Sequence, residues 1–142
     1  MKNSSPITIL WVEDDPADVR LTQETFKEFK LVNNFSILNN GGDVLKFLRK
    51  EDGYKESPTP DLIILDLNLP RKNGIEILAE IRADETFTDI PVGVLTSSTS
   101  EIDIINIYNL KSNFYLTKPV EFFEFIKIIT SLPSFGLAIV NN

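Results

Sequence analysis

Residues 62–70 are Leu62-Ile63-Ile64-Leu65-Asp66-Leu67-Asn68-Leu69-Pro70, four apolar residues that lead directly into a carboxylate and then to a proline. A short, continuous apolar run bounded by turn residues is typical of a strand that is buried on both faces. Such strands belong to parallel sheets, where functional groups collect just beyond the carboxyl ends of the strands. We therefore expect Asp66 to lie at a functional edge of a sheet, although an Asp here could also simply cap a loop.

The remainder of the chain alternates between apolar, β-rich runs and stretches with helical periodicity. The predicted strands are residues 7–12, 35–38, 62–65, 91–95 and 114–117. The predicted helices are residues 16–30, 42–50, 74–84, 100–110 and 120–132. Asp15 followed by Pro16 is typical of an N-cap and the first position of a helix. Five strands alternating with five helices indicate an α/β fold, with helices on both faces of a parallel sheet.

The composition excludes several classes of function. The chain has 142 residues, a formal net charge of −7, no Cys and no His, so disulfides, thiol chemistry and histidine ligands or bases are ruled out. No basic patch is visible that would bind nucleic acid. Neither a signal peptide nor a membrane-spanning run appears. We expect a single-domain, cytoplasmic protein that binds neither nucleic acid nor membrane.

Only Asn39 and Asn40 follow the second predicted strand, whereas acidic, hydroxyl or basic residues follow the other four. They are Glu13 and Asp14 after the first strand, Asp66 after the third, Thr96 after the fourth and Lys118 after the fifth. A doubly wound sheet brings such strand ends together at one crevice. Three crowded carboxylates need a cation, and oxygen donors favour Mg²⁺, while a lysine and a threonine hydroxyl suit a phosphoryl group. Each piece alone is commonly a helix cap or a turn, but their occurrence at successive strand ends is specific.

These residues carry a resemblance to the receiver domain of two-component response regulators, the CheY-like superfamily, over residues 7–132. The matching segments are Leu10-Trp11-Val12-Glu13-Asp14-Asp15-Pro16, Leu65-Asp66-Leu67-Asn68-Leu69-Pro70 with Gly74, Leu95-Thr96-Ser97, and Tyr115-Leu116-Thr117-Lys118-Pro119. The resemblance implies a flavodoxin-like, three-layer α/β/α fold with strand order 2-1-3-4-5. It also implies that residues 1–142 are one receiver domain, with residues 133–142 as a C-terminal tail.

The resemblance further implies a role for each site residue. Asp66 is expected to be the phosphoacceptor, forming a 4-aspartylphosphate. Mg²⁺ is expected to be held directly by Asp14 and Asp66, by the backbone carbonyl of Asn68, and by Glu13 through a water molecule.

Three further residues are expected to read the phosphoryl group. Thr96 and Lys118 would contact it, and Tyr115 would turn inward as an aromatic switch when Thr96 moves. The implied function is a stand-alone regulator, not an enzyme, that accepts a phosphoryl group from a sensor histidine kinase, assists its own dephosphorylation, and switches conformation to control partner binding. The 51–61 loop and the tail resemble more narrowly the regulators that serve phytochrome-type kinases.

Other functions stay open at this point. A receiver-fold adaptor that is never phosphorylated is the main alternative. A Mg²⁺-dependent aspartyl-phosphate phosphatase would need a second acid where this chain has Asn68, and a flavin-binding protein would need a phosphate loop after the first strand. Two residues depart from the family pattern: Lys111 stands where a Gly is usual, and Gly136 where an aromatic is common.

The predicted helix at 120–132 has an unusually wide apolar arc, with Phe123 and Ile128 on its margins. The helix at 100–110 also spreads its isoleucines around its circumference. Either the apolar tail covers this surface, or the chain forms an isologous homodimer through the fourth and fifth helices or the tail.

Overall fold

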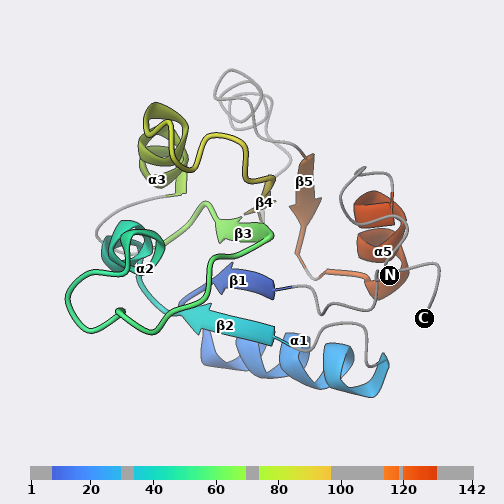
Figure 1. The fold of residues 1–142 in the computed structure, drawn as a ribbon. Helices are drawn as coiled ribbons and strands as arrows, with labels where there is room; N and C mark the ends of the chain where they lie inside the picture. Colours follow the sequence, from blue (N-terminus) through green and yellow to red (C-terminus); the bar gives the residue numbers. More distant parts are fainter. Residues whose placement is uncertain (1–7, 30–33, 70–73, 97–113, 119, 131–142) are drawn as a thin grey trace, which may run out of the picture.

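The strands form one parallel sheet in the predicted order. A computed structural model describes residues 8–29, 34–69, 74–96, 114–118 and 120–130. The strands are β1 (Thr8–Val12), β2 (Asn34–Leu38), β3 (Leu62–Asp66), β4 (Val92–Thr96) and β5 (Phe114–Thr117). All four pairings are parallel and give the order β2-β1-β3-β4-β5 (Figure 1), which confirms the expected flavodoxin-like topology.

The helices lie on both faces of the sheet. They are α1 (Pro16–Phe29), α2 (Val44–Arg49), α3 (Gly74–Ala83) and α5 (Phe122–Thr130), with a 3₁₀ turn η1 (Gly41–Asp43) before α2. In Figure 1, α2 and α3 lie to the left of the sheet, and α1 and α5 lie below it and to its right. The predicted helix at 100–110 lies outside the described residues. None of the described helices is long and apolar enough to cross a lipid bilayer.

Two helix starts follow from local hydrogen bonds. The Asp15 carboxylate accepts hydrogen bonds from the backbone N–H groups of Ala17 (2.9 Å) and Asp18 (3.3 Å), which confirms the predicted N-cap. The second helix starts later than predicted, because Asn40 caps a 3₁₀ turn by accepting from Asp43 N–H at 3.0 Å.

The sheet separates two hydrophobic cores. Side chains alternate along β1, so that Leu10 and Val12 belong to the core beneath α2 and α3, whereas Ile9 and Trp11 belong to the core that contains Phe125 of α5. All five residues are fully buried. The central strands are therefore apolar on both faces, which explains their continuous apolar runs in the sequence.

The connection after β3 is packed tightly against the backbone. A Cβ atom added at Gly74 would collide with the carbonyl oxygen of Asp66 and lie 2.9 Å from Leu67 Cα. The Gly74 N–H donates to the Leu67 carbonyl at 3.1 Å. Glycine at this position therefore lets α3 begin directly beside the carboxyl end of β3.

Candidate functional site

The carboxyl ends of four strands meet at one edge of the sheet. The register aligns Val12 with Leu65, Asp66 with Leu95 and Thr96 with Thr117. The residues that end these strands, or follow them directly, are Glu13, Asp66, Thr96 and Lys118. The predicted gathering of strand ends is thus present in the structure.

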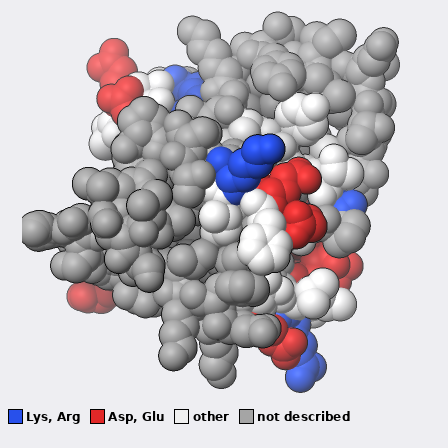
Figure 2. Space-filling view, turned by 90° about the vertical axis from the view of Figure 1, so that its right-hand side faces the viewer, with Lys and Arg blue, Asp and Glu red and all other residues white. Residues whose placement is uncertain are grey.

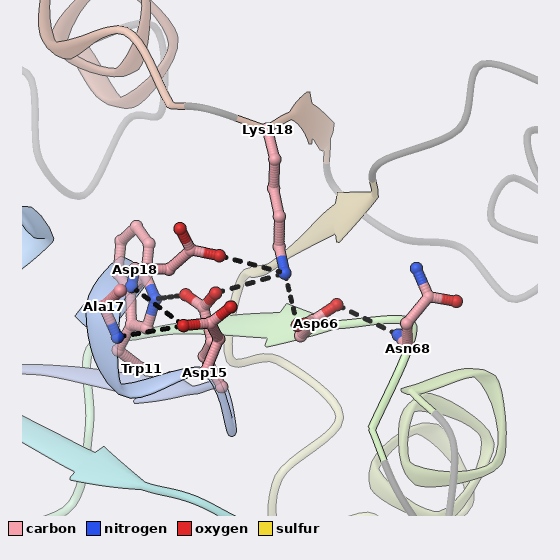
Figure 3. Close-up of polar contacts among 8 residues, drawn as sticks. Trp11, Asp15, Ala17, Asp18, Asp66, Asn68 and Lys118 are labelled. Carbon is pink, nitrogen blue, oxygen red and sulfur yellow. Dashed lines mark hydrogen bonds and ion pairs between the residues drawn. The ribbon is translucent and has the colours of Figure 1, made fainter.

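Asp66 is a buried carboxylate with a partner on each oxygen. Its residue is 1% exposed. Lys118 Nζ donates to Oδ2 at 2.6 Å, and the backbone N–H of Asn68 donates to Oδ1 at 2.9 Å (Figure 3). These two donors, one of them a cation, hold the carboxylate in place through both of its oxygens.

Lys118 lies among three carboxylates. Besides Asp66, its Nζ lies 3.1 Å from Glu13 Oε2 and 3.9 Å from Asp18 Oδ2. Its backbone N–H donates to the Thr96 carbonyl at 2.9 Å, which fixes the start of its side chain. Burial alone would lower the pKa of the Lys118 ammonium, but the contacts with Asp66 and Glu13 raise that pKa above its usual value. Lys118 is therefore a cation at neutral pH.

The two carboxylate oxygens of Glu13 have different partners, Trp11 for one and Lys118 for the other. Its side chain is 2% exposed. Oε1 accepts a hydrogen bond from Trp11 Nε1 at 3.1 Å. Oε2 forms the ion pair with Lys118, although within the described part of the chain no donor meets it with hydrogen-bond geometry. Burial raises the pKa of Glu13, and the contacts with Trp11 and Lys118 offset only part of that effect.

The other acidic residues that follow β1 lie in different environments. Asp14 is exposed, Asp15 caps α1, and Asp18 lies about half-exposed in the first turn of that helix. Among the residues that the structure describes, no three acidic side chains are gathered closely enough to hold a metal ion. Instead, the Lys118 ammonium lies between Glu13 and Asp66.

The donor chemistry nevertheless fits a hard divalent cation. Every side chain at this edge that could bind a metal offers oxygen, from a carboxylate or from the hydroxyl of Thr96. The buried Oε2 of Glu13 also has spare acceptor capacity. The roles of Asp14, Asp66, Asn68 and Glu13 as ligands remain predictions.

The two predicted switch residues lie on β4 and β5. Thr96 is 1% exposed. Tyr115 is partly buried and packs against the core beneath α2 and α3. The residues after Thr96, and the departures at Lys111 and Gly136, lie outside the described part of the chain.

Sequence analysis missed two residues of this site. Asp18 lies three residues after the N-cap, where an acidic residue is ordinary helix chemistry, and Trp11 reads simply as a buried strand residue. The two-residue spacing of Trp11 and Glu13, which places both side chains on one face of an extended strand, was the available signal.

Basic side chains are dispersed on the face of the molecule where α5 lies, which is the right-hand side of Figure 1. Figure 2 shows Lys and Arg side chains lying apart from one another, among acidic and uncharged residues. On this face, the residues that the structure describes form no continuous basic patch.

Comparisons with known proteins agree with this geometry. The family model "Response regulator receiver domain" matches residues 9–130. Response regulator Rcp1 from Synechocystis sp. is 42% identical over 139 residues, which cover 98% of this chain and 95% of the relative. The probable methanogenesis regulatory protein FilR2 from Methanothrix harundinacea is 33% identical, covering 96% of this chain and 88% of the relative.

Solved structures show the same relationship. The Mn(2+)-bound form of Rcp1 superposes with a TM-score of 0.77 at 44% identity, covering 93% of this chain and 95% of that one. The phosphorylated cyanobacterial phytochrome response regulator RcpA gives a TM-score of 0.78 at 39% identity, covering 92% and 94%. The narrower resemblance to regulators of phytochrome signalling is therefore confirmed. The chain belongs to the family of response regulator receiver domains, the phosphoryl-accepting switches of two-component signal transduction.

Proposed function

We propose that Asp66 accepts a phosphoryl group from a phosphohistidine of a sensor histidine kinase, and that the resulting aspartyl phosphate controls the binding of a partner. The observation that carries this proposal is the buried Asp66 carboxylate, paired with Lys118 at 2.6 Å. The chain is a regulator rather than a classical enzyme, since its family acts by being modified.

The transfer step uses groups that are already close together. A carboxylate oxygen of Asp66 attacks phosphorus, the new P–O bond forms as the P–N bond of phosphohistidine breaks, and the imidazole of the kinase leaves and takes a proton from solvent. The Lys118 ammonium neutralises charge on the phosphoryl oxygens. The Thr96 hydroxyl donates to one of these oxygens.

A divalent cation fits the donor set described above, and we propose Mg²⁺. When bound, it would neutralise the carboxylates and the incoming phosphoryl group. Asp14, Asp66 and the Asn68 carbonyl would hold it directly, and Glu13 through water. Support comes from the all-oxygen donor set and from the Mn(2+)-bound form of the similar protein Rcp1.

Phosphorylation would then act through local charge. The aspartyl phosphate carries about two negative charges, which draw Thr96 toward it. Tyr115 moves into the vacated space, so that the face formed by β5 and α5 changes shape. Attack of water on the phosphoryl group returns the carboxylate and releases inorganic phosphate, a reaction that the same site residues assist.

The partners of the regulator follow in part from similarity. A phytochrome-type sensor kinase is the proposed donor, because RcpA is a phytochrome response regulator. We also predict that residues 1–142 act as one stand-alone receiver domain. The predicted location is the cytoplasm, and neither nucleic acid nor a membrane is a predicted partner. Phe123 on α5 is 67% exposed, as the predicted margin of a homodimer surface requires. Ile128 is predicted to lie on the other margin of that surface, and its side chain is outside the described part of the structure.

One experiment tests the proposed phosphoacceptor. Wild type incubated with acetyl phosphate and Mg²⁺ should gain one phosphoryl group, and Asp66→Asn should gain none while staying folded, as its circular dichroism spectrum would show. Asp61→Asn is the matched control, since Asp61 is an exposed acid at the opposite end of β3, and it should be labelled normally. Undiminished labelling of Asp66→Asn would reject the assignment.

A further inference from the structure

The indole of Trp11 is bonded directly to an acid of the site. Trp11 is fully buried, and its Nε1–H donates to Glu13 Oε1 at 3.1 Å inside the protein. An indole N–H can only donate, so this contact directs one carboxylate oxygen of Glu13 toward Trp11 and fixes the orientation of the carboxylate. The opposite oxygen, Oε2, is thereby turned toward Lys118, 3.1 Å away. Figure 3 shows Trp11 in the group of Asp15, Ala17 and Asp18 at the start of α1, and Lys118 between this group and Asp66.

The ring that makes this bond is itself held on both sides. It stacks on Phe35 at a centroid distance of 5.6 Å and an interplanar angle of 27°, and it meets Phe125 at 6.2 Å and 55°. The backbone N–H of Glu13 also donates to the Leu38 carbonyl at 3.0 Å. Both ends of the Trp11–Glu13 contact are thus fixed by the fold, so the carboxylate is oriented before any cation binds.

We infer that Trp11 is a positioning residue, which holds Glu13 in the orientation that the cation site and Lys118 require. The inference rests on the proposed function and adds to it a residue that touches neither the phosphoryl group nor the cation. An apolar residue at position 11 could also pack in the core, but it would remove the donor to the buried Oε1 of Glu13 and leave the carboxylate less firmly oriented. The indole N–H is therefore used by the site, while the ring serves the core.

The inference makes the single tryptophan of the chain a reporter of the site. The wild-type spectrum should contain one indole ¹⁵N–¹H resonance. This resonance should move when Mg²⁺ is added, and also in Glu13→Ala, because both changes alter the acceptor of the N–H. A resonance that stays in place in both cases would contradict a bond between Trp11 and Glu13 in solution.

Calorimetric titration with Mg²⁺ separates positioning from packing. Trp11→Phe should bind Mg²⁺ about tenfold more weakly than wild type, which corresponds to about 1.4 kcal/mol. Because Trp11→Phe also shrinks the core, a second variant replaces Trp11 with β-(3-benzothienyl)alanine, which keeps the shape of the ring and lacks the N–H. It should show the same tenfold loss. Leu62→Ala is the matched control, because Leu62 is fully buried in the same core but lies at the end of β3 opposite Asp66. It loosens the core and keeps the indole N–H with the rings of Phe35 and Phe125, and it should bind within twofold of wild type.

The positioning role of Trp11 and the proposed function can fail independently of each other. Wild-type affinity in the benzothienyl variant, or an equal loss in Leu62→Ala, would overturn the positioning role. If Asp66 were not labelled by acetyl phosphate while Trp11→Phe and its benzothienyl counterpart still weakened Mg²⁺ binding, the proposed function would fail and the positioning role would stand.

Discussion

Replacement of Lys118 with methionine tests the charge balance of the resting site. The substitution keeps most of the side-chain volume but removes the ammonium that lies 2.6 Å from Asp66 and 3.1 Å from Glu13. Removal of one partner from a buried ion pair typically costs about 3 to 5 kcal/mol, because a buried charge is left uncompensated. The Lys118 side chain is 19% exposed, and its pair with the half-exposed Asp18 adds little. We therefore expect a loss at the lower end, about 3 kcal/mol.

Urea unfolding at pH 8 in the presence of EDTA measures this loss without contribution from a metal. A destabilisation of about 3 kcal/mol corresponds to a decrease in Tm of about 10 °C for a domain of this size. Lys46→Met is the matched control: Lys46 is an exposed lysine on α2, and its loss should change the free energy of unfolding by less than about 0.5 kcal/mol.

The sign of the pH dependence follows from the raised pKa of Lys118. Because the folded-state pKa lies above the ordinary value of 10.5, the stabilising contribution is fully present below that value and is lost as pH rises through the folded-state pKa. The difference between wild type and Lys118→Met should therefore shrink in strongly alkaline solution. A Lys118→Met protein that is as stable as wild type at pH 8 would refute the ion-pair cluster.

Three further predictions concern the cation, a loop and the surface. Asp14→Ala should weaken Mg²⁺ binding at least tenfold in calorimetric titration, and wild-type affinity would show that the proposed ligand set is wrong. Tyr54→Phe should cost about 1 kcal/mol at pH 7, since the Tyr54 hydroxyl donates to Asp43 Oδ2 at 2.7 Å. That hydrogen bond raises the pKa of Tyr54 above 10.0, so the loss of stability in Tyr54→Phe should disappear as pH rises through the folded-state pKa of Tyr54. A loss that persists above that pH would contradict the assignment. Phe123→Glu should shift a homodimer toward monomer in sedimentation experiments without unfolding the protein, whereas a wild type that is monomeric at high concentration, phosphorylated or not, would contradict the homodimer.

The sequence predicts the sheet and its functional edge because both depend on local patterns. Continuous apolar runs mark the central strands, and the residue after each run, such as Asp66 or Lys118, lies at the strand end whatever the details of packing. The start of α2 was less predictable, since the side chain of Asn40 competes with helix formation and stabilises a 3₁₀ turn.

Side-chain contacts between elements were the part that sequence reasoning could not supply. Three crowded carboxylates were expected to need a cation, but in the structure the Lys118 ammonium lies between two of them. That arrangement depends on the rotamer of a long side chain and on the turn of α1 that carries Asp18. The bond from Trp11 to Glu13 likewise depends on the orientation of a ring inside the core.

Chemical identification of the phosphorylated residue tests the central claim most directly. The protein is phosphorylated with acetyl phosphate and Mg²⁺ and treated with sodium borohydride, which reduces an aspartyl phosphate to homoserine, and the peptides are sequenced by mass spectrometry. We predict homoserine at position 66 and unmodified aspartate at positions 14, 15 and 18. Homoserine at one of those other positions, or phosphate that survives reduction on a hydroxyl side chain, would contradict the account.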